Sequence, residues 1–135
     1  MDNSTTHRNL HPTEGELIIL RVLWRRRGSA TVREVHDAIS RTRDTAYTTV
    51  LKMMTIMAEK GLVTRDERER SHLYTAVHPE PQVQSALLRD LMQRAFSGSA
   101  VQLVQSALDG DAASADELDA MAAMIAEARA RRDQA

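Results

Sequence analysis

Cysteine and long apolar runs are both missing from this 135-residue chain. The absence of cysteine excludes disulfide bonds, Cys-ligated zinc, iron–sulfur clusters and thiol nucleophiles, and it suits a reducing cytoplasm. The apolar runs, such as Leu17–Leu20, are all far short of the ~20 residues that span a bilayer. Residues 1–11 are polar and lack the apolar core of a signal peptide. We therefore expect a cytoplasmic protein that does not insert into a membrane.

Aromatic residues and catalytic motifs are also scarce. The chain has one tryptophan, two tyrosines and one phenylalanine, and we expect Trp24, Tyr47 and Tyr74 to lie in the core rather than in a ligand pocket. No glycine-rich phosphate loop, HExxH or GxSxG pattern occurs. No two of the five histidines have metal-ligand spacing within a helix. The sequence predicts no enzyme, no metal site and no cofactor.

What the sequence does contain is a segregation of charge. The formal net charge is −1, but between Arg21 and Arg70 there are twelve Lys or Arg and seven Asp or Glu, whereas residues 82–135 hold five and eight. A polyanionic partner would meet the basic front half. The length and the 42% hydrophobic content fit one compact domain, or one small domain with a dimerising tail.

Capping signals predict two helices near the start of the chain. Thr13 and Thr31 each precede a glutamate by three residues, which is the spacing of a capping box. The first helix is expected over about 13–27 and the second up to about Ile39, because apolar residues recur there at helical spacing. Residues 29–31 are expected to form only a short link.

A third helix is predicted from Asp44 or Thr45 to Lys60, where Gly61 ends it. The apolar stripe that we expect to face the core consists of Tyr47, Val50, Leu51, Met54, Met57 and Ala58.

Beyond this helix the apolar period changes to two. Residues 62–65 and 72–77 are rich in β-branched or aromatic side chains, and the charged segment 66–71 separates them, which predicts a β-hairpin. Pro79 and Pro81 then mark a boundary. Three further helices are predicted over 81–96, 99–108 and 115–132.

Three short helices followed by a hairpin form the order of a winged helix-turn-helix. In that fold the third helix enters the DNA major groove and the hairpin reaches along the backbone. The predicted fold class is therefore mainly α with a small β-hairpin. We expect a disordered arm over 1–11, a winged-helix DNA-binding domain over 12–78 and a helical dimerisation region over 79–135.

Thr48, Thr49 and Lys52 are the candidate base contacts, since they lie near the start of the third helix and point away from its apolar stripe. Short hydroxyls meet base edges or thymine methyls, and a lysine reaches guanine acceptors or phosphate. From these residues alone, an ordinary solvated face is an equally good interpretation.

Arginines provide the candidate backbone contacts. Arg33 begins the second helix, at the end that crosses the phosphate backbone in helix-turn-helix proteins. A period of two would place Arg68 and Arg70 on one side of the wing and two glutamates on the other, so these arginines are the expected wing contacts. The three arginines over 25–27 favour a solvated or helix-capping role.

Four segments occur in a characteristic order: PTEGELIILRVLW (12–24), ATVREVH (30–36), AYTTVL (46–51) and EKGLV (59–63). Over roughly residues 12–108 the chain resembles the penicillinase-repressor family, the BlaI/MecI/CopY group of bacterial transcriptional repressors. The resemblance implies a homodimer whose winged helices bind a palindromic operator in double-stranded DNA, as in repressors of beta-lactam resistance genes. It places base contacts on Thr48, Thr49 and Lys52, and we count the adjacent Tyr47 among the DNA-binding residues.

Apolar stripes in the back half are too wide for about 50 residues to bury against themselves, so we expect them to pair with a second copy. A helical cap on the front domain is the alternative. The expected dimerisation residues are Leu87, Leu88, Leu91, Leu103, Val104, Leu118, Met121 and Ile125.

The family resemblance also implies release by proteolysis, which a membrane-bound sensor metallopeptidase triggers indirectly. The cut would fall at Ser106–Ala107, although this sequence lacks the family's Asn-Phe pair there. Two alternatives stay open. One is a ligand-controlled winged-helix repressor of the multiple-antibiotic-resistance type, against which the scarcity of aromatics counts. The other is a helical protein-interaction adaptor.

Overall fold

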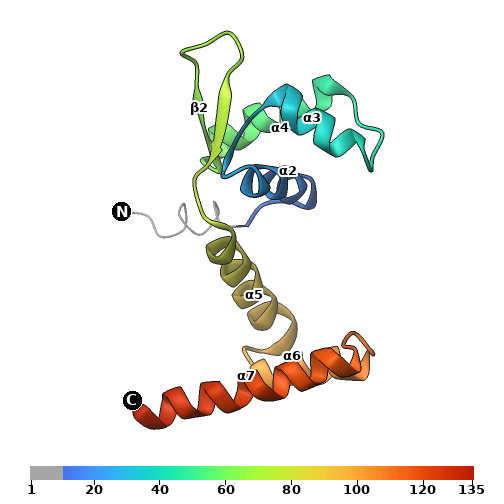
Figure 1. Cartoon of the computed structure of the whole chain (residues 1–135), viewed down its shortest axis with the longest axis vertical. Helices are drawn as coiled ribbons and strands as arrows, with labels where there is room; N and C mark the ends of the chain where they lie inside the picture. The colour runs from blue at the N-terminus through green and yellow to red at the C-terminus, as the bar shows by residue number, and fades with distance from the viewer. Residues whose placement is uncertain (1–10) are drawn as a thin grey trace. The chain divides into compact units, whose positions relative to one another are not determined.

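The computed structural model describes residues 11–135. Most of the expected N-terminal arm, residues 1–10, lies outside the described residues. The chain divides into two compact units, with the division between Arg89 and Asp90. No helix in the described part combines the length and apolar content needed to cross a bilayer. Figure 1 shows the elements in chain order.

The first two helices of the described chain begin with the predicted capping boxes. Helix α2 (Glu14–Arg25) and helix α3 (Val32–Ser40) follow Thr13 and Thr31, and each threonine hydroxyl accepts the amide hydrogen of the glutamate three residues later, at 3.2 Å in both cases. Helix α2 ends two residues before its expected end, because Arg27 and Gly28 adopt positive φ angles of 62° and 95°. Helix α4 (Tyr47–Lys60) ends as predicted at Gly61, whose φ is 83°.

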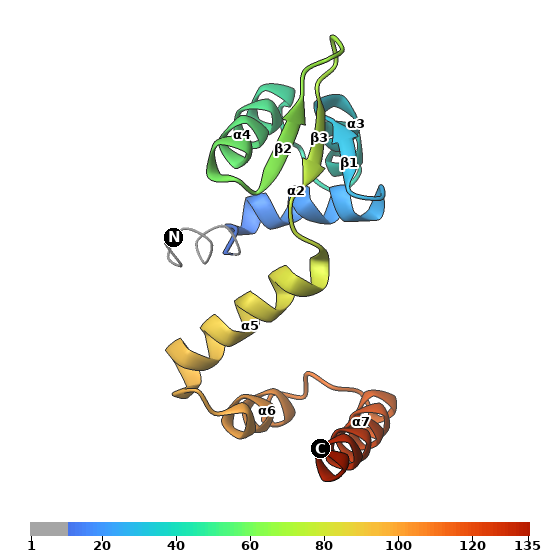
Figure 2. The same ribbon diagram turned by 90° about the vertical axis from the view of Figure 1, so that its left-hand side faces the viewer.

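The sheet has one strand more than the predicted hairpin. Strands β2 (Val63–Asp66) and β3 (Leu73–Ala76) form that hairpin, and β1 (Ser29–Thr31) pairs with the other edge of β3, giving the antiparallel order β1-β3-β2 (Figure 2). The expectation that residues 29–31 are only a link was therefore wrong. Three residues are too few to show an alternation of apolar and polar side chains, and their partner strand lies more than 40 positions away in the sequence. The hydroxyls of Ser29 on β1 and Thr75 on β3 are 2.8 Å apart.

The core of this unit lies between the three helices and the sheet, and Tyr74 is buried in it as predicted. The prediction was wrong for Tyr47 and Leu51, which are 38% and 41% exposed. One helix face is narrower than the apolar stripe in the sequence, so only part of the stripe is buried. Val50, Met54 and Met57 are the buried residues of α4, and Met53 and Ala58 pack half-buried against the same core.

An ion pair between a half-exposed lysine and a buried glutamate joins the start of α2 to the end of α4. The Glu16 side chain is 6% exposed, and the Lys60 Nζ donates to its two carboxylate oxygens at 2.8 and 2.9 Å. The Thr13 amide donates to the same carboxylate at 2.9 Å. Burial acts to raise the pKa of Glu16, but the hydrogen bonds from Lys60 and Thr13 outweigh it and lower the pKa.

The three predicted C-terminal helices are present within two residues of their expected bounds. They are α5 (Glu80–Phe96), α6 (Ala100–Asp109) and α7 (Ala115–Gln134). Ser99 and Ser114 cap α6 and α7 with their hydroxyls. The fold class is therefore confirmed as mainly α with a small antiparallel sheet, in the order of a winged helix followed by a helical region.

Candidate nucleic-acid interface

The outward face of α4 carries the candidate base contacts. Burial of Val50 and Met54 fixes the rotation of the helix, and Thr48, Thr49 and Lys52 are consequently exposed near its N-terminal end. Ala46 precedes the helix and makes no side-chain cap hydrogen bond, so the first amide groups of α4 are not capped by a side chain. Hydroxyls, an ammonium group and backbone amides thus share one exposed end of the helix.

Leu51 adds an apolar side chain to this exposed surface, and sequence reasoning missed it. Ile56 is 39% exposed on the same helix. An apolar residue at helical spacing carries no sequence signal that separates a core position from a surface one. Exposed apolar side chains of this kind are able to contact thymine methyl groups.

Tyr47 lies between two side chains of α3 at the start of α4. The guanidinium carbon of Arg33 is 5.3 Å from the centre of the Tyr47 ring, and the His36 ring meets the same ring edge-on at 5.7 Å. His36 Nε2 is also 2.8 Å from the carbonyl oxygen of Thr45. These contacts hold the first turn of α4 against α3, and they place Arg33 beside it.

The wing tip differs from its sequence-based description. Residues 67–72 are not extended strand, so the expected alternation of arginine and glutamate sides is absent. Arg68 folds back onto Asp66, with Nη2 2.8 Å and Nε 3.1 Å from the carboxylate, and Arg65 pairs with Glu67. The hydrogen bonds from Arg68 lower the pKa of Asp66 to about 2. Arg70 is exposed and has no ion pair within residues 11–135.

The arginine run at the end of α2 has a structural partner in α3. Arg26 is the C-cap residue of α2 and forms an ion pair with Glu34. Hydrogen bonds from Thr31, together with the Arg26 charge, lower the pKa of Glu34. This pair joins the two helices beside the N-terminus of α3.

The candidate dimerisation residues are mostly at the surface of the single chain. Among the exposed ones, Leu91 is 49% and Ile125 58% exposed. Helices α6 and α7, all of whose residues are described, contain no buried residue. The exposed candidates are Leu88, Leu91, Val104, Leu118 and Ile125, and the half-buried ones are Leu87, Leu103 and Met121.

Comparison with known proteins covers nearly all of the described chain. The sequence model of one family, described as penicillinase repressor, matches residues 12–127. Two relatives are each named transcriptional regulator BlaI, and they come from the strains CDC 1551 / Oshkosh and ATCC 25618 / H37Rv of Mycobacterium tuberculosis. Each is 38% identical to this chain over 118 residues, which is 85% of this chain and 83% of the relative.

Proposed function

This chain belongs to the penicillinase repressor family of transcriptional repressors, and from that membership we propose that two copies bind one palindromic operator through helix α4. The exposed N-terminal end of α4 is the observation that carries the proposal. In a winged helix-turn-helix this helix enters the major groove, where base edges are distinguishable. Thr48 and Thr49 would meet bases there, and Lys52 would reach a guanine or a phosphate.

Phosphate contacts would come from α3 and the wing. Arg33 stacks on Tyr47 beside the start of α4, so it is held near the groove that α4 enters. Arg70 is exposed and free of ion pairs in the described part of the chain. It can therefore contact a DNA phosphate without breaking an existing ion pair. Arg68 would have to exchange the Asp66 carboxylate for a DNA phosphate.

Pairing of two chains would cover the apolar surface of the C-terminal helices. A helix in water is stable chiefly through burial of its apolar face. Since α6 and α7 bury no residue in the single chain, a second copy supplies the missing contact. The same pairing joins two winged helices and so raises the affinity for a two-fold symmetric site.

A gel shift on the DNA upstream of the chain's own gene tests the DNA interface. Thr49→Ala should weaken binding by ~1–3 kcal/mol and relax preference at one base pair, whereas Lys52→Ala should weaken all sequences alike and lower the salt slope by about one if it contacts phosphate. Ser85→Ala on α5 is the control and should bind as the wild type does. Unchanged affinity and site preference in Thr49→Ala would remove Thr49 from the base-contacting residues. No DNA binding at all would favour the protein-interaction adaptor.

Analytical ultracentrifugation of an aspartate variant tests the dimer. Ile125 is exposed in the single chain, so Ile125→Asp should leave the fold intact while burying an unpaired charge in the interface. We expect the dissociation constant of the dimer to be at least tenfold higher than that of the wild type. Ala123→Asp, an exposed position away from the apolar stripe of α7, should leave the dimer unchanged. Equal dimer stability in Ile125→Asp and the wild type would contradict the proposed interface.

Release would follow from a cut that separates α7 from the winged helix. The expected bond, Ser106–Ala107, lies in α6, where both residues are exposed. A cut there would remove one of the paired helices and leave each winged helix to bind alone. Immunoblots of induced cells should then show a fragment of roughly the first hundred residues. Full-length protein that persists while the operator is released would contradict proteolysis and favour control by a ligand.

A further inference from the structure

A groove of about 820 Å³ lies between α2 and α3 in the first unit. No residue of α4 or of the wing lines it, so it is separate from the proposed DNA interface. Its apolar lining consists of Leu17, Ile18, Val22, Ala38 and Ile39, of which Ile39 belongs to the core and Ile18 and Val22 pack against it. The volume falls within the range of small-molecule sites.

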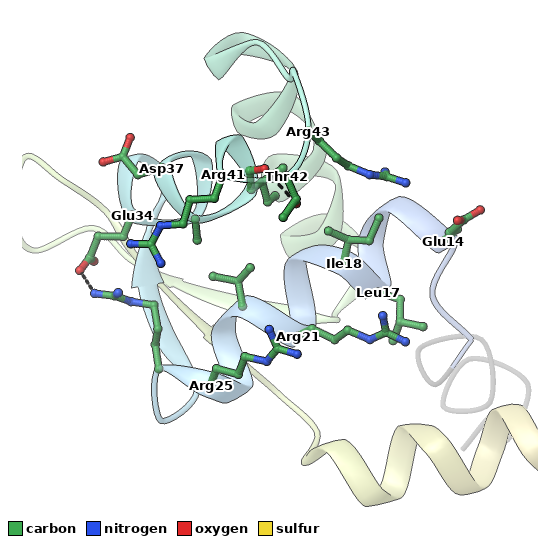
Figure 3. Close-up of a pocket in the computed structure, with 14 residues that line it drawn as sticks. Glu14, Leu17, Ile18, Arg21, Arg25, Glu34, Asp37, Arg41, Thr42 and Arg43 are labelled. Atoms are coloured by element: carbon green, nitrogen blue, oxygen red, sulfur yellow. Dashed lines mark hydrogen bonds and ion pairs between the residues drawn. The ribbon is translucent and has the colours of Figure 1, made fainter. Parts of the chain in front are cut away.

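Arginines surround this apolar lining. Figure 3 shows Arg21 and Arg25 extending along α2, Arg41 at the end of α3 directed toward Glu34, and Arg43 at the other end of the groove near Glu14. All four are exposed, and none of their side chains has an ion pair or a hydrogen bond within residues 11–135. A fifth arginine is already paired with Glu34.

Three carboxylates also line the groove, and they are too few to neutralise its arginines. Glu34 is engaged by Arg26 and by the Thr31 amide. Asp37 lies 3.6 Å from His36, and Glu14 is exposed at the end near Arg43 (Figure 3). Four unpaired guanidinium groups thus face two available carboxylates.

We propose that this groove, the α2–α3 groove, binds a small organic acid that combines an aliphatic body with a carboxylate. The aliphatic part would lie on the apolar lining, which removes both surfaces from water. The carboxylate would accept two parallel hydrogen bonds from one guanidinium group, that of Arg25 or Arg41, a geometry that suits arginine better than lysine. Such a ligand bridges α2 to the turn that precedes α4.

Octanoate is a probe of this chemistry, and two relatives of it separate the contributions. Octanamide keeps the chain without the charge, and acetate keeps the charge without the chain. In an amide NMR titration of the full-length protein we expect octanoate to shift signals of α2 and α3 saturably, with a dissociation constant on the order of 1 mM for a ligand of this size. Octanamide and acetate should each bind at least tenfold more weakly.

The variant Arg25→Gln/Arg41→Gln should bind octanoate at least tenfold more weakly, because the charged hydrogen bonds are lost. Arg129→Gln/Arg131→Gln on α7 removes the same charge elsewhere and should bind like the wild type. Both variants should keep the wild-type melting temperature, since all four side chains are exposed. Absence of saturable octanoate binding, equal binding of acetate, or equal affinity in the groove variant would each overturn the proposal. Loss of operator affinity in the groove variant without any octanoate binding would identify these arginines as DNA contacts instead.

Discussion

Replacing Lys60 by methionine removes the charged partner of a buried carboxylate while keeping most of the aliphatic stem. Glu16 would retain one hydrogen bond, from the Thr13 amide, and would lose the two from Lys60 Nζ. Breaking a fully buried ion pair from one side costs ~3–5 kcal/mol. Lys60 is 43% exposed, so water partly replaces it, and we expect the free energy of unfolding to fall by about 1–3 kcal/mol near pH 7.

The pH dependence makes this prediction specific to Glu16. Its pKa in the folded chain lies below the ordinary value of 4.5. A carboxyl group with a lowered pKa stabilises the fold above its unfolded pKa, and the contribution is lost as the pH falls through the folded pKa. The difference between the wild type and Lys60→Met should therefore be full near pH 7 and should shrink progressively below pH 4.5.

Urea unfolding followed by Trp24 fluorescence measures this difference, because the chain has a single tryptophan. All samples need one protomer concentration, since association adds to apparent stability. Lys52→Met is the matched control on the same helix, and it should change stability by no more than about 0.5 kcal/mol because Lys52 is exposed. Equal stability of the two variants, or a loss in Lys60→Met that is as large at about pH 3.5 as at about pH 7, would refute the reasoning.

Two further predictions concern the wing and the segment that follows it. Asp66→Asn should release Arg68, so that non-specific DNA binding strengthens and the slope of log affinity against log salt steepens by about one; an unchanged slope in a gel-shift salt series would show that Arg68 does not reach phosphate. Trp24→Phe should lose the hydrogen bond from the indole Nε1 to the His78 carbonyl oxygen, which is 3.0 Å long, and thereby lower the free energy of unfolding by about 1–2 kcal/mol. Circular dichroism during urea unfolding measures that loss, and an unchanged midpoint would contradict it.

Local signals in the sequence predicted the helices of this fold well, and non-local pairing explains what they missed. A threonine and a glutamate three residues apart contain all the information of a capping box, and both predicted boxes exist. Strand β1 depends instead on β3, more than 40 residues further along the chain. Tyr47 and Leu51 followed helical spacing, but which part of an apolar stripe reaches the core depends on how α4 packs against its neighbours.

In the candidate site, too, the sequence indicated the features that depend on one helix and missed those that depend on the folding of a loop or on two helices together. The exposed positions of Thr48, Thr49 and Lys52 follow from the period of one helix, so the sequence alone indicated them. The pairing of Arg68 with Asp66 depends on the conformation of a six-residue tip, which a period of two does not describe. The α2–α3 groove arises where two helices meet and therefore has no sequence signature.

The number of chains on one operator tests the central claim most directly. Sedimentation of the full-length protein with a DNA duplex from upstream of its own gene, at moderate salt, gives this number at saturation. The proposal predicts two chains on each site, with half-sites about one helical turn, or ~10 base pairs, apart or at a multiple of that spacing. Saturation at one chain with undiminished affinity would contradict the paired winged helix, as would the absence of binding to any such duplex.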